Sequence, residues 1–353
     1  MTRHLARELD KRGHRVRVLA NRYPRTLADQ ELIDGVEITR WHFLSPRLEQ
    51  LLNLRFDLFL AGLLYFPLTL ARLVLLLRRE RPDTVNLHFV GAPALFVLLA
   101  RWFIRFRLIV SLHGDDVEGL ARRRRLDLAV FRSILRQADV VTACSQYLLD
   151  KVDEQVSLAG NKGRVVHNGI ELSKKMKTPA QQTGILAVGR LFPAKGFDVL
   201  LRAHAAIKEQ ALLTLVGDGP ERAKLQELAL SLGLNGDFRF IANQDQQEVM
   251  NAIANAAVVA IPSRRESFGL VALEAMACGK PVVATRVGGL PEVLAGADAL
   301  LVEPESAPEL AHAIEAALRR VKSDPHFGAR NRRCAERFSI SRMTDGYLEA
   351  YDG

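Results

Sequence analysis

The sequence predicts an α/β protein of two domains, each built on a parallel sheet with helices on both faces. Short apolar runs of strand length alternate with helical stretches along most of the chain. The 353 residues are enough for two domains that each bury a core of their own. Near the middle, the polar segment SKKMKTPAQQT has no apolar periodicity, which is typical of a linker.

The apolar runs form two series, one on each side of this linker. Alternation of such runs with helical patterns, for example Leu126–Gln137, predicts parallel sheets and Rossmann-like domains that face each other across a central cleft. The expected organisation is a first domain over 1–170, a linker over 171–183, a second domain over 184–325 and a helical segment over 326–353. The last helix, Ile340–Tyr351, is expected to pack back onto the first domain. The predicted strands are 16–20, 84–89, 107–114, 140–145, 184–190, 212–219, 258–263, 281–289 and 299–304.

Composition places the chain among soluble globular proteins of a reducing compartment. Hydrophobic residues make up 48% and charged residues 25% of the sequence. The three cysteines, Cys144, Cys278 and Cys334, are far apart and odd in number, which argues against a disulfide framework and against a zinc site. The first 20 residues mix charged and apolar residues and do not form a signal peptide. We therefore expect a cytoplasmic protein.

The positive charge is confined to the first half of the chain. Residues 1–168 carry 27 Lys and Arg against 18 Asp and Glu, a balance of +9, whereas residues 169–353 carry 22 against 22. Such a half can face an anionic membrane or an acidic substrate. We expect no nucleic-acid partner, because no nucleic-acid-binding motif is present. The alternative, which we weigh equally with membrane binding, is a solvated, arginine-rich surface without a partner.

One apolar segment, Phe56–Leu77, has the length of a membrane span. Asp57, Pro67 and Arg72 interrupt it, and three arginines follow it at 78, 79 and 81. Our first interpretation is a pair of core helices broken at Pro67. The alternative is a helix that lies in the membrane interface, and a transmembrane span is the third choice.

Two groups of residues follow predicted strands of the second half. The first is G-R-L-F-P-A-K-G, which includes Gly189, Arg190, Lys195 and Gly196. Glycine allows the sharp turn into the next helix, and a guanidinium together with an ammonium suits a pyrophosphate. A βα turn with two surface cations would look the same.

The second group runs from Glu266 to Pro281 and contains E-S-F-G-L-V-A-L-E. Ser267 is expected to cap a helix that ends at Gly279. The amides of Phe268, Gly269 and Leu270 would then form an anion site at a helix N-terminus. Within that apolar helix, the carboxylate of Glu274 needs hydrogen-bond donors, which ribose or sugar hydroxyls could supply; an exposed helical glutamate is the alternative.

These motifs resemble those of the retaining GT-B glycosyltransferases of family 4. The pattern E-x7-E at Glu266–Glu274 and the block G-R-x4-K-G at 189–196 carry the resemblance, with further matches at His113-Gly114, 168–170, 217–220 and 288–292. The resemblance implies transfer of a hexose-type sugar from a nucleoside-diphosphate sugar to a hydroxyl group. We expect a glycan or lipid-linked acceptor in cell-surface glycan or glycolipid biosynthesis, and the basic, apolar first half favours a lipid-linked acceptor at the inner membrane face.

The resemblance also implies roles for individual residues. Arg190 and Lys195 hold the diphosphate of the donor, together with the amides at 268–270. Glu274 accepts hydrogen bonds from the ribose hydroxyls and Glu266 from hydroxyls of the transferred sugar. His113 faces that sugar across the cleft. No D-x-D triplet is present, so we expect neither a metal nor another cofactor.

The chain departs from the family at its start. Family members open with a strand and a glycine-rich loop, whereas residues 2–12 already have the pattern of the first helix. We expect that strand and loop to be missing, through a mis-assigned start or a truncation. A non-catalytic accessory protein or a sugar-nucleotide epimerase with the same fold are the rival interpretations.

Overall fold

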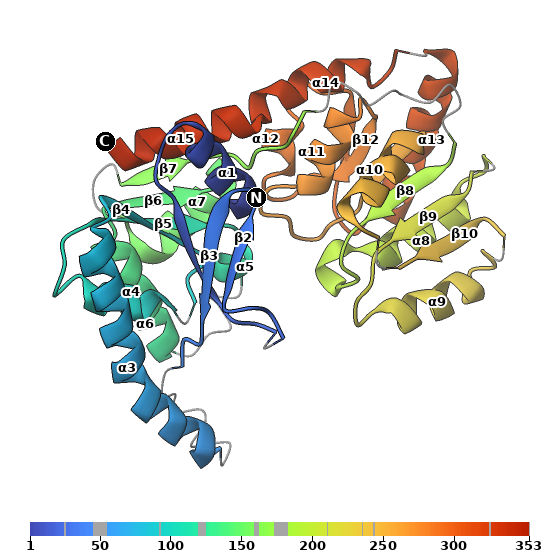
Figure 1. The fold of residues 1–353 in the computed structure, drawn as a ribbon. Helices are drawn as coiled ribbons and strands as arrows, with labels where there is room; N and C mark the ends of the chain where they lie inside the picture. Colours follow the sequence, from blue (N-terminus) through green and yellow to red (C-terminus); the bar gives the residue numbers. More distant parts are fainter. Residues whose placement is uncertain are drawn as a thin grey trace. The chain divides into compact units, whose positions relative to one another are not determined.

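The computed structural model describes residues 1–24, 26–44, 55–91, 93–118, 125–158, 162–172, 183–209, 211–234, 236–242, 244–324 and 326–352 (Figure 1). The chain separates into two compact units. Apart from the short segment Ser145–Tyr147, the chain passes from unit 1 to unit 2 between Val166 and His167, four residues before the boundary predicted at 170. Most of the predicted linker, 173–182, lies outside the described residues. Unit 1 comprises Met1–Cys144, Leu148–Val166 and Met343–Gly353, and unit 2 comprises Ser145–Tyr147 and His167–Arg342.

Unit 2 is built on a six-stranded sheet of order β10-β9-β8-β11-β12-β13, in which every neighbouring pair is parallel. The chain enters at β8, builds outward to β10 and then returns to the other side of β8 with β11. The strand order therefore reverses between β8 and β11, which is the position where sheets of this kind bind ligands. The strands are β8 (Ile185–Val188), β9 (Leu213–Val216), β10 (Phe238–Ile241), β11 (Val258–Ile261), β12 (Val282–Thr285) and β13 (Ala299–Val302).

Helices connect these strands, as parallel pairing requires. Four residues in each of β9, β11 and β12 are buried, as expected for strands that helices cover on both faces. The helices are α8 (Phe197–Ala206), α9 (Arg222–Ser231), α10 (Gln246–Asn255), α11 (Leu270–Ala277), α12 (Leu290–Val293), α13 (Ala307–Ser323) and α14 (Ala329–Ala335), with 3-10 turns η2 (Pro193–Lys195) and η3 (Glu336–Phe338).

Unit 1 contains two sheets. Strands β4 to β7 form a parallel sheet in sequence order, whereas β1, β3 and β2 form a separate sheet that includes the antiparallel pair β2–β3. Among the described residues, β1 and β4 each pair with one strand only. The missing first strand stays a prediction. The strands are β1 (Arg17–Asn21), β2 (Gln30–Ile33), β3 (Val36–Trp41), β4 (Thr84–His88), β5 (Arg107–Leu112), β6 (Val140–Ala143) and β7 (Gly163–Val165).

The last helix of the chain belongs largely to unit 1. Its residue Tyr347 is fully buried, and the Tyr351 hydroxyl accepts a hydrogen bond from Asn86 Nδ2 on β4 at 2.9 Å. The helices of unit 1 are α1 (Thr2–Lys11), α3 (Phe56–Glu80), α4 (Pro93–Ala100), α5 (Asp115–Glu118), α6 (Arg125–Gln137), α7 (Gln146–Val156) and α15 (Ile340–Asp352).

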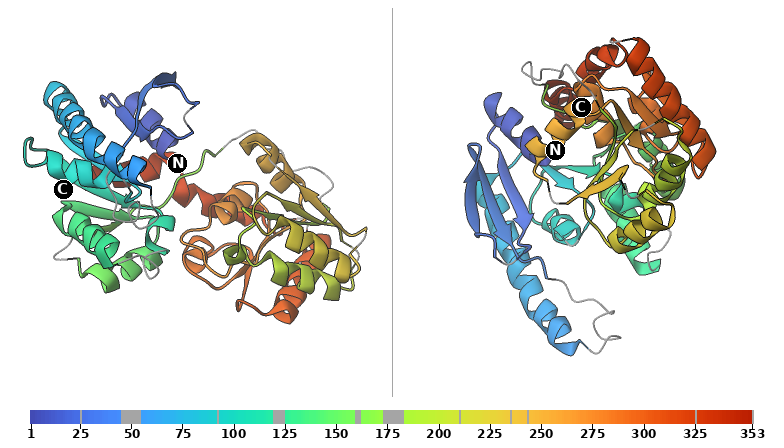
Figure 2. Two further views of the ribbon diagram at one scale, coloured as in Figure 1. Left: turned by 90° about the horizontal axis from the view of Figure 1, so that it is seen from below. Right: turned by 90° about the vertical axis from the view of Figure 1, so that its right-hand side faces the viewer.

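The prediction of core helices broken at Pro67 was wrong. The segment is one continuous helix, α3, with Pro67 inside it. The second half packs on the unit through the buried Leu73, Val74 and Leu77. In the first half, the ring centre of Phe66 lies 4.5 Å from the ring centre of Phe96 on α4. Figures 1 and 2 show the first half of α3 projecting away from the sheets of unit 1. Phe59–Glu80 is long and apolar enough to cross a membrane, and 28% of its most apolar stretch is buried.

Candidate functional site

Two loops leave the carboxyl ends of β8 and β11, at the point where the strand order reverses. They touch at Gly196, which has φ 65° and begins α8. A Cβ atom at this position would lie 2.0 Å from the carbonyl oxygen of Pro262. Only glycine adopts this conformation without strain and leaves room for the neighbouring backbone. The contact between the loops therefore depends on Gly196.

Lys195 and Glu266 meet where these loops touch. Lys195 Nζ donates to Glu266 Oε2 at 2.6 Å, and the two side chains are 28% and 16% exposed. Both residues line a cavity of about 10 Å³, together with Val188, Pro262, Ser263 and Gly269. The sequence predicted that both residues belong to the donor site, and the structure brings them into direct contact.

A third loop fixes the backbone at Glu266. Gly288 has φ 57°, and a Cβ atom there would lie 1.7 Å from the carbonyl oxygen of Glu266. The same oxygen accepts a hydrogen bond from the amide of Gly289 at 3.0 Å. The two glycines allow this close approach, which holds the start of the E-S-F-G segment in one position.

Ser267 does not cap α11, contrary to the prediction. The N-cap is Gly269, at φ 104°, and no side chain caps the helix. The Ser267 carbonyl instead accepts a hydrogen bond from Ser145 Oγ at 2.6 Å. Within the described chain, the amides of Phe268, Gly269 and Leu270 donate no hydrogen bond to protein. Free amides at a helix start attract an anion.

Arg190 and Phe268 have different surroundings from Lys195. The Arg190 guanidinium lies 5.3 Å from the centre of the Phe192 ring, whereas Lys195 pairs with Glu266. The Phe268 side chain is buried among aromatic rings, 5.8 Å from the Phe338 centre. Only the backbone of Phe268 is therefore available to a ligand.

Glu274 lies inside α11 with a protein donor already in place. Gln246 Nε2, at the start of α10, donates to Glu274 Oε1 at 2.8 Å. Burial raises the pKa of the Glu274 carboxyl, and the Gln246 hydrogen bond opposes this change. Gln246 is a site residue that sequence reasoning missed.

His113 follows β5 in unit 1 and is paired with a second histidine. His88 Nδ1 lies 3.0 Å from His113 Nε2, and the rings stack with centres 5.3 Å apart. Asp116 Oδ1 accepts from the amides of His113 and Gly114, at 3.2 and 2.9 Å, and fixes this turn. Sequence reasoning missed His88, although it ends a predicted strand as His113 does.

Both histidines are neutral at physiological pH. Burial lowers the pKa of His113 to about 4, with a smaller contribution from the N-terminal ammonium. Burial, and then the charge of His113, lowers the pKa of His88 to about 3. A neutral ring can position a ligand by hydrogen bonding, and it carries no charge at pH 7.

These shifts predict a loss of stability in acid. Since the folded protein binds a proton at His113 less readily than the unfolded chain does, stability falls as the pH drops from about 6.5 towards 4. From His113 alone, we expect the free energy of unfolding to fall by about 2 kcal/mol between pH 7 and pH 5. Urea titrations at pH 7 and pH 5 measure the free energy of unfolding. His113→Asn should flatten the dependence and His326→Asn, at an exposed site, should not; equal slopes in all three proteins would contradict the assignment.

Comparison with protein families decides the identity of the fold. Residues 1–174 match the family described as "Glycosyltransferase Family 4", and residues 170–333 match "Glycosyl transferases group 1". The chain belongs to the GT-B glycosyltransferases of family 4. The predicted α/β GT-B fold class is thereby confirmed.

Known proteins resemble this family 4 chain over its whole length in structure and over part of it in sequence. A D-inositol 3-phosphate glycosyltransferase of Saccharomonospora viridis is 36% identical over 244 residues, 62% of this chain and 56% of that protein. An N-acetyl-alpha-D-glucosaminyl L-malate synthase of Bacillus anthracis is 32% identical over 237 residues, 63% of this chain and 61% of that protein. The match thus spans about three fifths of these curated relatives.

Among solved structures, a sucrose-phosphate synthase from Thermosynechococcus elongatus has a TM-score of 0.78 at 24% identity. The alignment covers 99% of this chain and 91% of the other. The Anabaena protein HepE, solved in complex with UDP and glucose, has a TM-score of 0.70 at 23% identity, covering 90% of this chain and 86% of that one. At these identities the likeness concerns the fold.

Proposed function

We propose that the protein transfers a hexose-type sugar from a nucleoside-diphosphate sugar to a hydroxyl acceptor, with retention of configuration and without a metal ion. The bond between the anomeric carbon and the diphosphate oxygen breaks, and a bond from the acceptor oxygen forms on the same face, while the proton of the acceptor hydroxyl passes to the leaving diphosphate. Family membership supports the reaction class, and the complexes of HepE with UDP and glucose and with UDP-glucose support a nucleotide-sugar donor.

The observation that carries this proposal is the contact of Lys195 with Glu266 beside the free amides of 268–270. Negative charge builds on the diphosphate as it leaves, so a fixed cation and helix-start amides stabilise the transition state. When a donor binds, its phosphate competes with Glu266 for Lys195. The released carboxylate can then accept hydrogen bonds from the hydroxyls of the transferred sugar.

The remaining predicted residues complete this proposal. Arg190 assists Lys195 at the diphosphate, Glu274 accepts from the ribose hydroxyls in exchange for Gln246, and the neutral His113 contributes hydrogen bonding. Gly189 and Gly196 shape the loop that carries Arg190 and Lys195. Among the described residues, no group of three or more His, Cys, Asp and Glu side chains is placed to hold a metal ion. We assign the cationic role to Lys195, Arg190 and the amides.

Donor binding and turnover test the proposal. UDP-, GDP- and ADP-sugars are screened by thermal shift, and we expect one to raise the melting temperature, because a ligand of the folded state stabilises it by mass action. Slow release of the nucleoside diphosphate from that donor should persist in EDTA. Binding without release would favour the accessory protein, and loss in EDTA with recovery in Mn²⁺ would rule out the metal-independent mechanism.

We further propose that the protein works at the cytoplasmic face of an anionic membrane on a lipid-linked acceptor. Leu60, Leu64, Leu68 and Leu75 lie on one face of α3 and are 56 to 64% exposed. An apolar helical face with flanking cations is typical of an interfacial helix.

A basic, aromatic surface continues from the end of α3. Arg78, Arg81, Arg101, Phe103 and Arg105 line a hollow of about 940 Å³, and the neighbouring Trp102 is 78% exposed. Arginine and tryptophan are suited to the phosphate level of a bilayer. The exposed aromatic side chains among these arginines favour membrane binding over a solvated, arginine-rich face without a partner.

A further inference from the structure

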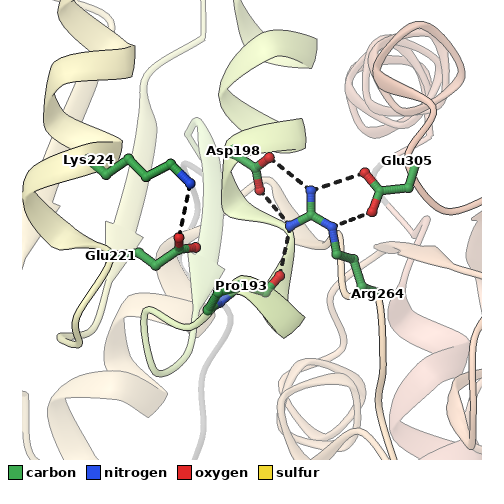
Figure 3. A network of polar contacts seen from close by, with 6 residues as sticks. All are labelled: Pro193, Asp198, Glu221, Lys224, Arg264 and Glu305. Atoms are coloured by element: carbon green, nitrogen blue, oxygen red, sulfur yellow. Dashed lines mark hydrogen bonds and ion pairs between the residues drawn. The ribbon is translucent and has the colours of Figure 1, made fainter.

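We propose that Arg264 is a positioning residue that fixes the Lys195 loop against the Glu266 loop, and so sets the affinity for the diphosphate. The inference rests on the proposed function, since it concerns the same donor site. Arg264 follows β11 and lies two residues before Glu266. Figure 3 shows its side chain between Asp198, Glu305 and the backbone of Pro193.

All five N–H groups of the Arg264 guanidinium have acceptors. Nη1 donates to the Pro193 carbonyl and to Asp198 Oδ1, both at 2.7 Å. Nη2 donates to Asp198 Oδ2 at 2.8 Å and to Glu305 Oε2 at 3.0 Å, and Nε donates to Glu305 Oε1. A guanidinium has five donors, so none remains for a phosphate. Arg264 therefore acts as a brace and not as a ligand of the donor.

The brace joins the segments that carry the site. Pro193 lies two residues before Lys195, and Asp198 lies in the first turn of α8, directly after the loop. The Arg264 amide also donates to the Ala194 carbonyl, at 2.8 Å. Glu305 anchors the guanidinium from the opposite side, in the turn between β13 and α13. Lys195 and Glu266 meet 71 residues apart in sequence because these contacts align their loops.

The arrangement requires arginine. Two forked ion pairs share one planar group, and the guanidinium side chain is 26% exposed, so the contacts are partly shielded from water. Lysine has three donors on a single nitrogen and cannot form two forks. The brace also contains two carboxylates and one guanidinium, a net charge of −1 close to a site for an anion.

Because of this net charge, an electrostatic role and a positioning role predict opposite changes in diphosphate affinity. Asp198→Asn and Glu305→Gln each remove a negative charge, which would strengthen diphosphate binding if only the electric field mattered. If the brace positions the loop, both changes weaken it, because the guanidinium loses acceptors. Titration calorimetry with UDP, GDP or ADP, whichever binds the wild type most tightly, measures the Kd. We expect Kd to rise about tenfold in each variant and in Arg264→Lys.

The matched control is Glu303→Gln. Glu303 is 62% exposed and pairs with Arg286 at 3.2 Å, whereas Glu305 is 58% exposed. The control removes the same charge two residues away, and its Kd should stay within twofold. Measurements are made at a temperature where melting curves show every variant folded. Affinity for the nucleoside without phosphates should also stay within twofold, which a general loss of structure would not allow.

The outcomes separate the two proposals. Wild-type Kd values in Glu305→Gln and Asp198→Asn, or tighter binding in either, would overturn the positioning role and leave the proposed function intact. Failure of the wild type to bind any nucleoside diphosphate would overturn the proposed function and this inference with it. Restoration of full affinity by Arg264→Lys would show that charge alone matters, and would also overturn the positioning role.

Discussion

Replacing Lys195 by methionine is expected to lower kcat/KM for donor turnover about a thousandfold. Lys195 Nζ is the cation held at the cleavage point of the proposed reaction, 2.6 Å from Glu266 and beside the start of α11. Removing one preorganised group that stabilises developing charge costs about 10²- to 10³-fold in rate. Methionine keeps the length of the side chain, so the comparison isolates the charge. Release of nucleoside diphosphate under subsaturating donor measures the effect.

The control for this prediction is Lys224→Met. Lys224 lies in the same unit, is 75% exposed and pairs with Glu221 at 3.3 Å (Figure 3). The kcat/KM of the Lys224→Met variant should remain within twofold of the wild-type value. A Lys195→Met enzyme that retains more than a tenth of wild-type turnover would show that the diphosphate is neutralised elsewhere, with Arg190 the next candidate.

Most of the sheet of unit 2 could be predicted because β8, β9, β11 and β12 are short, apolar and largely buried. The edge strand β10 was missed, and none of its residues is fully buried. Five predicted runs correspond to β8, β9, β11, β12 and β13. The loops of the candidate site, after β8 and β11, could be predicted because each follows a predicted strand and contains glycine. The pair β2–β3 was missed, since its residues alternate with charged ones such as Glu31 and Arg40, which form an ion pair at 2.7 Å across the strands. Such a pattern does not distinguish a strand from a polar loop.

Contacts that depend on the packing of distant elements could not be predicted. Gln246 reaches Glu274 because α10 packs beside α11, and nothing in the sequence near either residue indicates it. The five acceptors of Arg264 come from positions 193, 198 and 305, which only the folded sheet brings together. The packing of Phe66, next to Pro67 in α3, on Phe96 of α4 likewise has no signal in the local sequence.

Replacing Leu60, Leu64 and Leu68 together by glutamine is expected to weaken vesicle binding about a hundredfold. Each leucine is more than half exposed in the protein, so docking on a bilayer would bury that remaining surface. Full burial of a leucine side chain is worth about 1.5–3 kcal/mol, and half of that for three residues gives about 2–4.5 kcal/mol, which corresponds to a factor of about a hundred near the middle of the range. Co-sedimentation with vesicles of one-third phosphatidylglycerol in phosphatidylcholine measures the partition coefficient.

Because these leucines face solvent, the triple variant should keep the melting temperature of the wild type. The double variant Leu32→Gln, Leu230→Gln is the control, since these leucines are 72% and 65% exposed and lie outside α3. Salt separates the two parts of the interaction: 0.5 M NaCl should weaken the attraction of Arg78 and Arg81 for anionic lipid and leave the apolar part. Equal partition coefficients of the triple variant and the wild type at both salt concentrations would show that α3 does not contribute to membrane binding. The basic surface around Trp102 would then be the one remaining basis for membrane binding.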